Sequence, residues 1–303
     1  MRETVCEMKA EAITTVQYDQ PLVSVLMTAY NREEFIAEAI VSVLASTYTN
    51  FELIIIDDCS TDSTVTIAKS YEAKDGRVKV IVNEKNLRQF FNRNYAASLA
   101  KGEFIFFADS DDTIMPDGIE RLINTMSQFP SSSFGMYWYK APDVEAFVME
   151  STQAIHDHFF KNPILVIGPG GTIMRRSFFL DIKGYTDKYD AAGDMYFNLK
   201  ACCYSPLVRI PFDFLNYRRH ENQAINTPFE YLYNSYRYLK DALVEIPLPL
   251  SASELVWIRK KNNRRFLVNF CAYLLKTKNL GQAKKLLQKS GFKFKDALEG
   301  IFH

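Results

Sequence analysis

The sequence has few of the features that mark membrane, secreted or fibrous proteins. Its 303 residues include only 12 glycines and 11 prolines, which excludes collagen-like and linker-like material. No apolar run approaches the ~20 residues that a membrane-spanning helix needs. The five cysteines are an odd number without a C-x-x-C spacing, so neither a zinc ribbon nor a disulfide framework is indicated. Charges scattered through residues 1–20 leave no apolar core for a signal peptide, and we therefore expect a cytoplasmic protein.

Net charge is also absent, because 36 Lys and Arg residues balance 36 Asp and Glu residues. The balance hides an uneven distribution: residues 259–295 contain twelve basic residues and no acidic one. Two interpretations of this basic segment are open. It contacts an anionic membrane surface at the inner face of the cell membrane, or it packs an apolar helix face on the catalytic domain and turns its lysines to water. No nucleic-acid-binding module is recognisable, so we expect no nucleic-acid partner.

Residues 23–129 alternate between strand-like and helix-like patterns. Apolar runs rich in β-branched residues predict buried strands at residues 23–28, 51–56, 78–82 and 103–108. Helical periodicity or helix-start residues follow each strand, over residues 33–46, 60–73, 90–101 and 116–129. This alternation predicts an α/β fold in which a mostly parallel sheet is covered by helices on both faces.

The pattern changes after residue 130. Short strand-like pieces, a glycine-rich turn at residues 168–171 and one amphipathic helix near residues 194–204 follow, and continuous helical periodicity returns at Phe229. We therefore expect an N-terminal extension over residues 1–20, a catalytic domain over residues 21–227 and a C-terminal helical region over residues 228–303.

Polar clusters follow three of the predicted strands, at Thr28–Asn31, Asp57–Asp58 and Asp109–Asp112. In open parallel sheets the ligand crevice lies beyond the carboxyl ends of the strands. The last cluster places three carboxylates within four positions, and such oxygen ligands suit Mg²⁺ or Mn²⁺ bound to substrate phosphates. Each cluster also has a plainer interpretation, as a strand-ending turn or as an acidic helix start before Pro116.

Together these segments resemble the inverting nucleotide-sugar glycosyltransferases of family 2, which have the GT-A fold. The resemblance extends from about Pro21 to Ile225 and depends on the order of several short segments. These are VSVLMTAYN at Val23–Asn31, IDDCSTDST at Ile56–Thr64, NRN at Asn92–Asn94 with AKGE at Ala100–Glu103, ADSDD at Ala108–Asp112, GTIMRRSF at Gly171–Phe178, GDMYF at Gly193–Phe197 and YRRHENQ at Tyr217–Gln223.

The resemblance implies a role for individual residues. The nucleotide-binding residues would be Thr28, Ala29, Tyr30, Asp58, Arg93 and Ser110. The ligands of Mn²⁺ or Mg²⁺ would be Asp109, Asp111 and His220. Asp194 would be the general base. The family usually has a glutamate before this aspartate, and here that position is Gly193.

The expected activity is transfer of a sugar, with inversion, from a nucleotide-diphosphate donor to a hydroxyl of a glycan or lipid-linked glycan. The donor implied is a UDP-sugar and the context is bacterial surface-polysaccharide synthesis. Two alternatives stay open. Gly193 is compatible with a degenerate protein that binds a sugar nucleotide without catalysis. The Asp-x-Asp-x-Thr pattern at Asp109–Thr113 also fits a phosphotransferase of the haloacid dehalogenase type, although that motif normally closes the first strand of its domain.

Overall fold

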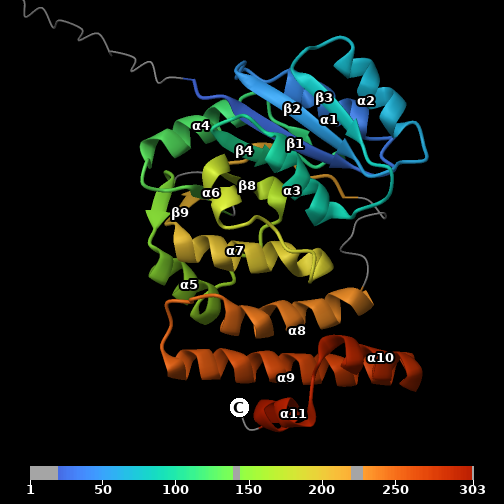
Figure 1. Ribbon diagram of the computed structural model, residues 1–303. Coiled ribbons are helices and arrows are strands. Elements are labelled where there is room, and N and C mark those ends of the chain that lie inside the picture. The colour runs from blue at the N-terminus through green and yellow to red at the C-terminus, as the bar shows by residue number, and fades with distance from the viewer. Residues whose placement is uncertain (1–19, 139–143, 220–227, 302–303) are drawn as a thin grey trace, which may run out of the picture.

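The computed structural model describes residues 20–138, 144–219 and 228–301 (Figure 1). The strands are β1 (Val23–Ala29), β2 (Phe51–Asp57), β3 (Val78–Val82), β4 (Phe104–Phe107), β5 (Thr113–Ile114), β6 (Phe134–Tyr137), β7 (Phe147–Met149), β8 (Thr172–Arg175), β9 (Leu207–Ile210) and β10 (Leu215–Asn216). The helices are α1 (Ile36–Leu44), α2 (Thr64–Glu72), α3 (Gln89–Leu99), α4 (Gly118–Gln128), α5 (Ser151–Phe160), α6 (Arg176–Asp181), α7 (Gly193–Tyr204), α8 (Pro228–Glu245), α9 (Ala252–Thr277), α10 (Leu280–Ser290) and α11 (Phe294–Ile301), with short 3₁₀ turns η1 (Pro169–Gly171) and η2 (Asp190–Ala192).

One mixed sheet contains eight of these strands, in the order β3-β2-β1-β4-β8-β6-β9-β7. The first four run parallel to one another, as the alternation of strands and helices predicts. The sheet becomes mixed at β8, which is antiparallel to both β4 and β6. Because β1, β2 and β4 are parallel neighbours, their carboxyl ends meet at one edge of the sheet. The predicted polar clusters follow these three ends.

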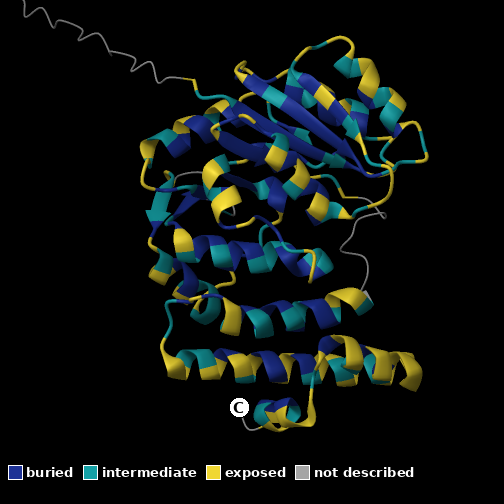
Figure 2. Cartoon of the chain, viewed as in Figure 1, coloured by how far each residue is buried: buried dark blue, intermediate teal, exposed yellow. Residues whose placement is uncertain are grey.

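The central strand β1 is buried on both faces. Val25 and Met27 pack in a cluster with apolar side chains of α1 and α4. Leu26 faces the other way, into a cluster that includes side chains of α3, α6 and α7. All three residues are at most 1% exposed, and Figure 2 shows the central strands as buried between flanking helices. This two-sided burial fixes the strand ends from which the site is built.

The C-terminal helices stack on the side of α7 that faces away from the sheet (Figure 1). Most of the apolar face of α10 is buried here: Ala283 is 4% exposed, and Leu286 packs fully buried in a cluster with Tyr236 and Phe266, whereas Leu280 at the start of the helix is 76% exposed. The expectation that this face packs on protein is met, but the face packs on α8 and α9 and not on the catalytic domain expected at residues 21–227. These buried side chains are not available to a membrane surface. Within the described ranges, no helix combines the length and apolarity needed to cross a bilayer.

Candidate active site

Asp58 lies just past the carboxyl end of β2, and N–H donors surround its carboxylate. Oδ1 accepts hydrogen bonds from the backbone N of Leu87 at 2.7 Å and from Nδ2 of Asn83 at 3.1 Å, and Oδ2 accepts one from the backbone N of Arg88 at 3.0 Å. The backbone N of Asp58 donates to the carbonyl of Ala29 at 2.8 Å. Asp58 is 5% exposed. These contacts hold its carboxylate in one position beside the end of β1.

The end of β1 supplies Thr28, Ala29 and Tyr30. Ala29 is buried, whereas Tyr30 is 46% exposed. Asn31 then turns the chain away from the sheet with a φ of 51°, and its Oδ1 accepts a hydrogen bond from the backbone N of Thr61 at 2.9 Å. The structure therefore brings Thr28, Ala29 and Tyr30 to the strand end next to Asp58, as the sequence predicts.

Two arginines hold the acidic turn that follows β4. Arg93 of α3 donates from Nη2 to Oδ1 of Asp109 at 2.5 Å, and Arg32 donates from Nε to Oδ2 of Asp111 at 3.1 Å. Arg32 also donates to the carbonyl of Tyr30 at 3.2 Å, which ties the acidic turn to the end of β1. Sequence reasoning missed Arg32. Its position directly after Tyr30 and Asn31 was the signal that could have identified it.

The other members of the acidic turn are buried. Ser110 is 3% exposed and Asp112 is 7% exposed. Oδ1 of Asp112 accepts a hydrogen bond from the backbone N of Arg218 at 2.8 Å, next to the pairing of β10 with β5. Burial raises the pKa of Asp112 to about 7, and the charges of Asp109 and Asp111 act in the same direction. Asp112 thus anchors the segment after β10 to the turn.

Asp194 is the second residue of α7. Its Oδ1 accepts a hydrogen bond from the backbone N of Met195 at 2.7 Å. Burial raises the pKa of Asp194 to about 7; the Met195 hydrogen bond and the charge of Arg93 lower it, and the charge of Asp109 raises it. The residue keeps some exposed surface. A carboxyl group with this pKa can accept a proton near neutral pH, as a general base must.

The glycine-rich turn at residues 168–171, which contains η1, passes beside the carboxylates of Asp109 and Asp194. A Cβ placed on Gly170 would lie 3.5 Å from Oδ2 of Asp109, and one on Gly168 would lie 3.9 Å from Oδ2 of Asp194. Arg93 bonds Asp109 and also acts electrostatically on Asp194. The expected base and the acidic turn therefore belong to one site, although they come from opposite ends of the catalytic region.

The space that a side chain at position 193 would need is already filled. A Cβ on Gly193 would lie 2.5 Å from Cε2 of Phe90 and 2.9 Å from the carbonyl oxygen of Thr186. Phe90 belongs to α3 and its ring stacks on Tyr185, with 5.0 Å between the centroids. The ring of Phe90 thus occupies the space that the side chain of a glutamate at position 193 would need.

The third expected metal ligand, His220, lies outside the described residues. Among those that are described, no group of three Asp, Glu, His or Cys side chains is placed to hold an ion. Asp109 and Asp111 supply carboxylate oxygens from a single turn. A hard cation such as Mg²⁺ commonly takes one or two protein carboxylates and completes its shell with substrate phosphates and water. The donor chemistry of this turn fits a site of that kind.

Comparison with known proteins gives one family match and several fold relatives. The family described as glycosyl transferase family 2 matches residues 24–183, just over half of the chain. A putative teichuronic acid biosynthesis glycosyltransferase, TuaG of Bacillus subtilis (strain 168), is 35% identical over 150 residues, which are 48% of this chain and 60% of TuaG. The chain thus spans less than two thirds of that relative.

Two solved structures share the fold. S. aureus TarS in complex with UDP-GlcNAc superposes with a TM-score of 0.67 at 21% identity, over 88% of this chain and 79% of TarS. The mannosyltransferase PcManGT from Pyrobaculum calidifontis, in complex with GDP-Man and Mn²⁺, superposes with a TM-score of 0.63 at 13% identity, over 94% of this chain and 88% of PcManGT.

The sheet and its carboxylate-lined edge define an α/β protein with the GT-A fold, as expected from the sequence. Within that class, the chain belongs to glycosyl transferase family 2. Its Asp-x-Asp-x-Thr segment follows β4, after three complete strand–helix units, rather than the first strand. The position of this segment in the sheet and the family match both contradict the alternative of a phosphotransferase of the haloacid dehalogenase type.

Proposed function

We propose that this protein is a glycosyltransferase that moves one sugar, with inversion, from a UDP-sugar to a hydroxyl group of a glycan. The observation that carries the proposal is that Arg93 donates a hydrogen bond to Asp109 and also acts electrostatically on Asp194, which joins the two carboxylates in one site. Asp109 would bind the cation that accompanies the donor diphosphate. Asp194 has the pKa of a base that accepts a proton near neutral pH.

The end of β1 and Asp58 are suited to the nucleotide. The exposed ring of Tyr30 offers a face on which a base can stack. A carboxylate has about four lone-pair positions, and the hydrogen bonds to Asp58 use three, which leaves one acceptor for a base N–H. Thr28, Ala29, Arg93 and Ser110 complete the nucleotide-binding set. The complex of TarS with UDP-GlcNAc supports a uridine donor.

Asp109 and Asp111, with His220, would hold Mn²⁺ or Mg²⁺ beside the donor diphosphate. The Mn²⁺ in the complex of PcManGT supports a divalent ion in this fold. When bound, such an ion offsets the negative charge that develops on the leaving diphosphate. Arg32 and Arg93 already pair with the two carboxylates, so they place positive charge beside the same leaving group.

Asp194 would take the proton from the acceptor hydroxyl while the acceptor oxygen forms a bond to the anomeric carbon. The bond from that carbon to the diphosphate breaks in the same displacement, and the nucleoside diphosphate leaves with its electron pair. A single displacement inverts the anomeric centre. Because the leaving group is a stabilised diphosphate, the reaction needs no second carboxyl group as an acid.

The acceptor would be a glycan, free or lipid-linked, in the synthesis of a bacterial surface polysaccharide. The name of TuaG, which assigns it to teichuronic acid biosynthesis, supports this context. We place the reaction in the cytoplasm or at the inner face of the cell membrane. Residues 21–227 would form the catalytic domain and residues 228–303 a helical addition to it.

A thermal-shift screen with UDP, GDP, CDP and dTDP, each with and without Mn²⁺, tests the proposal. We expect UDP with Mn²⁺ to raise the unfolding temperature most, because a ligand that binds only the folded state stabilises it. Asp111→Ala should lose the Mn²⁺-dependent part of the shift. Asp117→Ala, which removes an exposed carboxylate at the start of α4, is the matched control and should keep it.

Turnover separates an enzyme from a degenerate binding protein. We expect the protein to release UDP slowly from UDP-sugars in the presence of Mn²⁺, with water in the place of the acceptor. A protein that binds UDP-sugars with Mn²⁺ and never releases UDP, with any acceptor, would contradict the proposed function and support the binding-protein alternative.

A further inference from the structure

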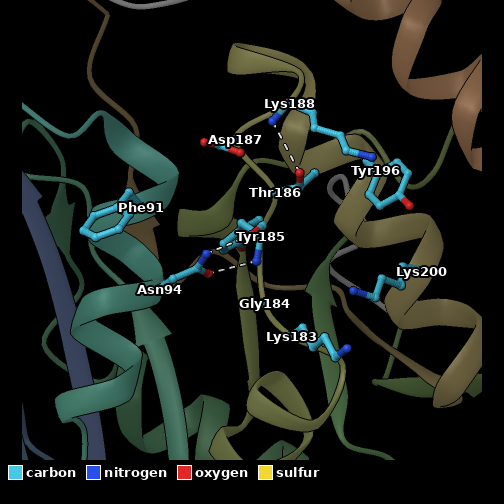
Figure 3. Close-up of a pocket in the computed structure, with 10 residues that line it drawn as sticks. All are labelled: Phe91, Asn94, Lys183, Gly184, Tyr185, Thr186, Asp187, Lys188, Tyr196 and Lys200. Carbon is cyan, nitrogen blue, oxygen red and sulfur yellow. Dashed lines mark hydrogen bonds between the residues drawn. The ribbon is translucent and has the colours of Figure 1, made fainter.

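A hollow lies on the outer side of the segment that joins α6 to α7. It has a volume of about 410 Å³, within the range of small-molecule sites, and no residue assigned to the active site lines it. Figure 3 shows its walls: α3 on one side, α7 on the other and residues 183–188 between them. Three lysines, Lys183, Lys188 and Lys200, line it, and we call it the lysine pocket. The rings of Phe91 and Tyr196 also line it.

Hydrogen bonds and close packing fix the walls of the lysine pocket. Asn94 of α3 donates from Nδ2 to the carbonyl of Tyr185 at 2.8 Å and accepts from its backbone N, through Oδ1, at 2.9 Å. Gly184 has a φ of 51°, and a Cβ on it would lie 2.4 Å from Oδ1 of Asn94. Only glycine allows this close approach. The hollow is therefore formed by the fold itself.

The lysine pocket carries more positive charge than its surroundings balance. Lys188 pairs with Glu245 at 3.3 Å. In the part of the chain that the structure describes, neither Lys183 nor Lys200 has an ion-pair partner, and Asp187 is the one acidic residue in the lining. Burial lowers the pKa of Lys200, and the charge of Lys183 lowers it further. A bound anion would relieve this repulsion.

We propose that the lysine pocket binds an acidic sugar residue, one that carries a carboxylate or a phosphate, of the glycan acceptor. Lys183 and Lys200 supply the charge that recognises the acidic group. Phe91, which is 49% exposed, and Tyr196 supply flat apolar faces against which the carbon face of a sugar ring can pack. A free phosphate ion would use the lysines without the rings. That the bound glycan is the acceptor of the reaction depends on the proposed function, whereas the binding of an acidic sugar does not.

The lysine pocket is close to the active site without being part of it. Tyr185 lines the pocket, and its hydroxyl group is within electrostatic reach of Arg93 and Asp194. α7 connects the two places as well, because it begins with Asp194 in its first turn and presents Tyr196 and Lys200 to the pocket. A glycan whose reacting hydroxyl lies at Asp194 could therefore place a neighbouring sugar in the pocket.

Titration calorimetry at low salt, with the full chain, tests the inference with four probes. Two are acidic sugars, a hyaluronan tetrasaccharide with carboxylates and glucose 6-phosphate with a phosphate; cellotetraose is the neutral sugar and inorganic phosphate the bare anion. We expect at least one acidic sugar to bind, more tightly than cellotetraose and inorganic phosphate, and binding to weaken with added salt. The better of the two acidic probes identifies the acidic group.

The charge-removing variant is Lys183→Gln with Lys200→Gln, and its matched control is Lys79→Gln with Lys101→Gln, two exposed lysines elsewhere. We expect the first pair to weaken binding of the acidic sugar about tenfold or more, which corresponds to about 1.4 kcal/mol, and the control to leave it unchanged. Lys183→Arg with Lys200→Arg keeps the charge and should keep binding, which separates a lost site from a misfolded variant.

Equal affinity in the Lys183→Gln, Lys200→Gln variant and the parent would overturn the inference. So would cellotetraose or inorganic phosphate that binds as tightly as the better of the two acidic sugars. The measurement needs no turnover. A protein that fails the nucleotide screen but binds acidic sugars through these lysines would contradict the proposed function and keep the pocket, and the reverse result would do the opposite.

Discussion

Asp58 and Asp194 are carboxylates of the same site, but the protein surrounds them in different ways. Asp58 accepts hydrogen bonds from two backbone N–H groups and one side-chain amide. Asp194 accepts one, from the neighbouring Met195, and burial raises its pKa to about 7. A carboxylate surrounded by donors is a fixed hydrogen-bond acceptor. A buried carboxylate that has lost contact with water and accepts fewer hydrogen bonds has a raised pKa, so it can gain and lose a proton near neutral pH.

The difference assigns separate tasks to the two sides of the site. On the side of β1 and β2, the contacts favour recognition of a ligand that does not react. On the side of α7, the environment favours proton transfer. Under the proposed function, the same residue type would serve two purposes because its surroundings differ, which is a recurring way for one site to combine binding with acid–base chemistry. Each prediction below changes one side and leaves the other intact.

The largest effect is expected from Asp194→Asn, which removes the proton acceptor while nearly keeping the shape. We expect the rate of UDP release from a UDP-sugar to fall by about 10²- to 10⁴-fold, the usual contribution of a general base. UDP affinity, measured by calorimetry, should stay unchanged. Asp181→Asn, at an exposed position at the end of α6, is the control. A variant at Asp194 that keeps the parental rate would show that the base lies elsewhere.

The pH dependence of the same reaction comes next. Because a protonated Asp194 cannot accept a proton, the rate should rise by up to about tenfold per unit below pH 7 and level off above it. Stability should move in the opposite direction. The pKa is raised from 3.8 to about 7 on folding, so the folded state binds the extra proton and stability falls as pH rises through this interval.

Unfolding temperatures of the parent and of Asp194→Asn between pH 4 and pH 8 measure that slope. Asp112 also has a pKa raised to about 7, so the parent slope alone does not isolate one group. The difference between the slopes of the parent and of Asp194→Asn isolates the contribution of Asp194. We expect the variant to lose part of the decline, and identical slopes in the two proteins would contradict a raised pKa at Asp194.

A smaller effect, on binding rather than turnover, is expected from Asp58→Ala. The change leaves the backbone N–H groups of Leu87 and Arg88 without their acceptor, which should cost about 1–3 kcal/mol in the free energy of unfolding by urea. Loss of the remaining acceptor for the base should weaken UDP binding by roughly tenfold, the value of one hydrogen bond to a charged group. Full UDP affinity in a folded Asp58→Ala protein would remove Asp58 from the nucleotide site.

The parallel half of the sheet could be predicted because each of its strands is a local apolar run that identifies the strand without reference to its neighbours. The apolar runs at residues 23–28 and 51–56 match β1 and β2, and each is followed by its own helix. β8 could not be predicted in this way. It has four residues, and its neighbours β4 and β6 are distant in sequence. Its place in the sheet depends on long-range packing, which a local pattern does not encode.

The site shows the same limit. Strand ends and the family resemblance led to Asp58, Asp109, Asp111 and Asp194, which the structure brings to one edge. The arginine partners of the acidic turn are contacts between separate elements, so the sequence alone gave no reason to pair Arg32 with Asp111. Gly193 is the clearest case: its departure from glutamate is visible in the sequence, but the reason lies in a ring on another helix.

The close approach of Phe90 to Gly193 gives the last prediction, which concerns stability alone and not ligand binding or turnover. Gly193→Ala would force its Cβ against Phe90 and the carbonyl of Thr186, and such overpacking should cost about 1–3 kcal/mol in the free energy of unfolding. Gly76→Ala is the control, because a Cβ there meets nothing within 4 Å; it should be neutral or slightly stabilising. Adding Phe90→Ala to Gly193→Ala should cost less than the sum of the single changes, because the two positions compete for one space. Additive costs would mean that the ring and the glycine are independent.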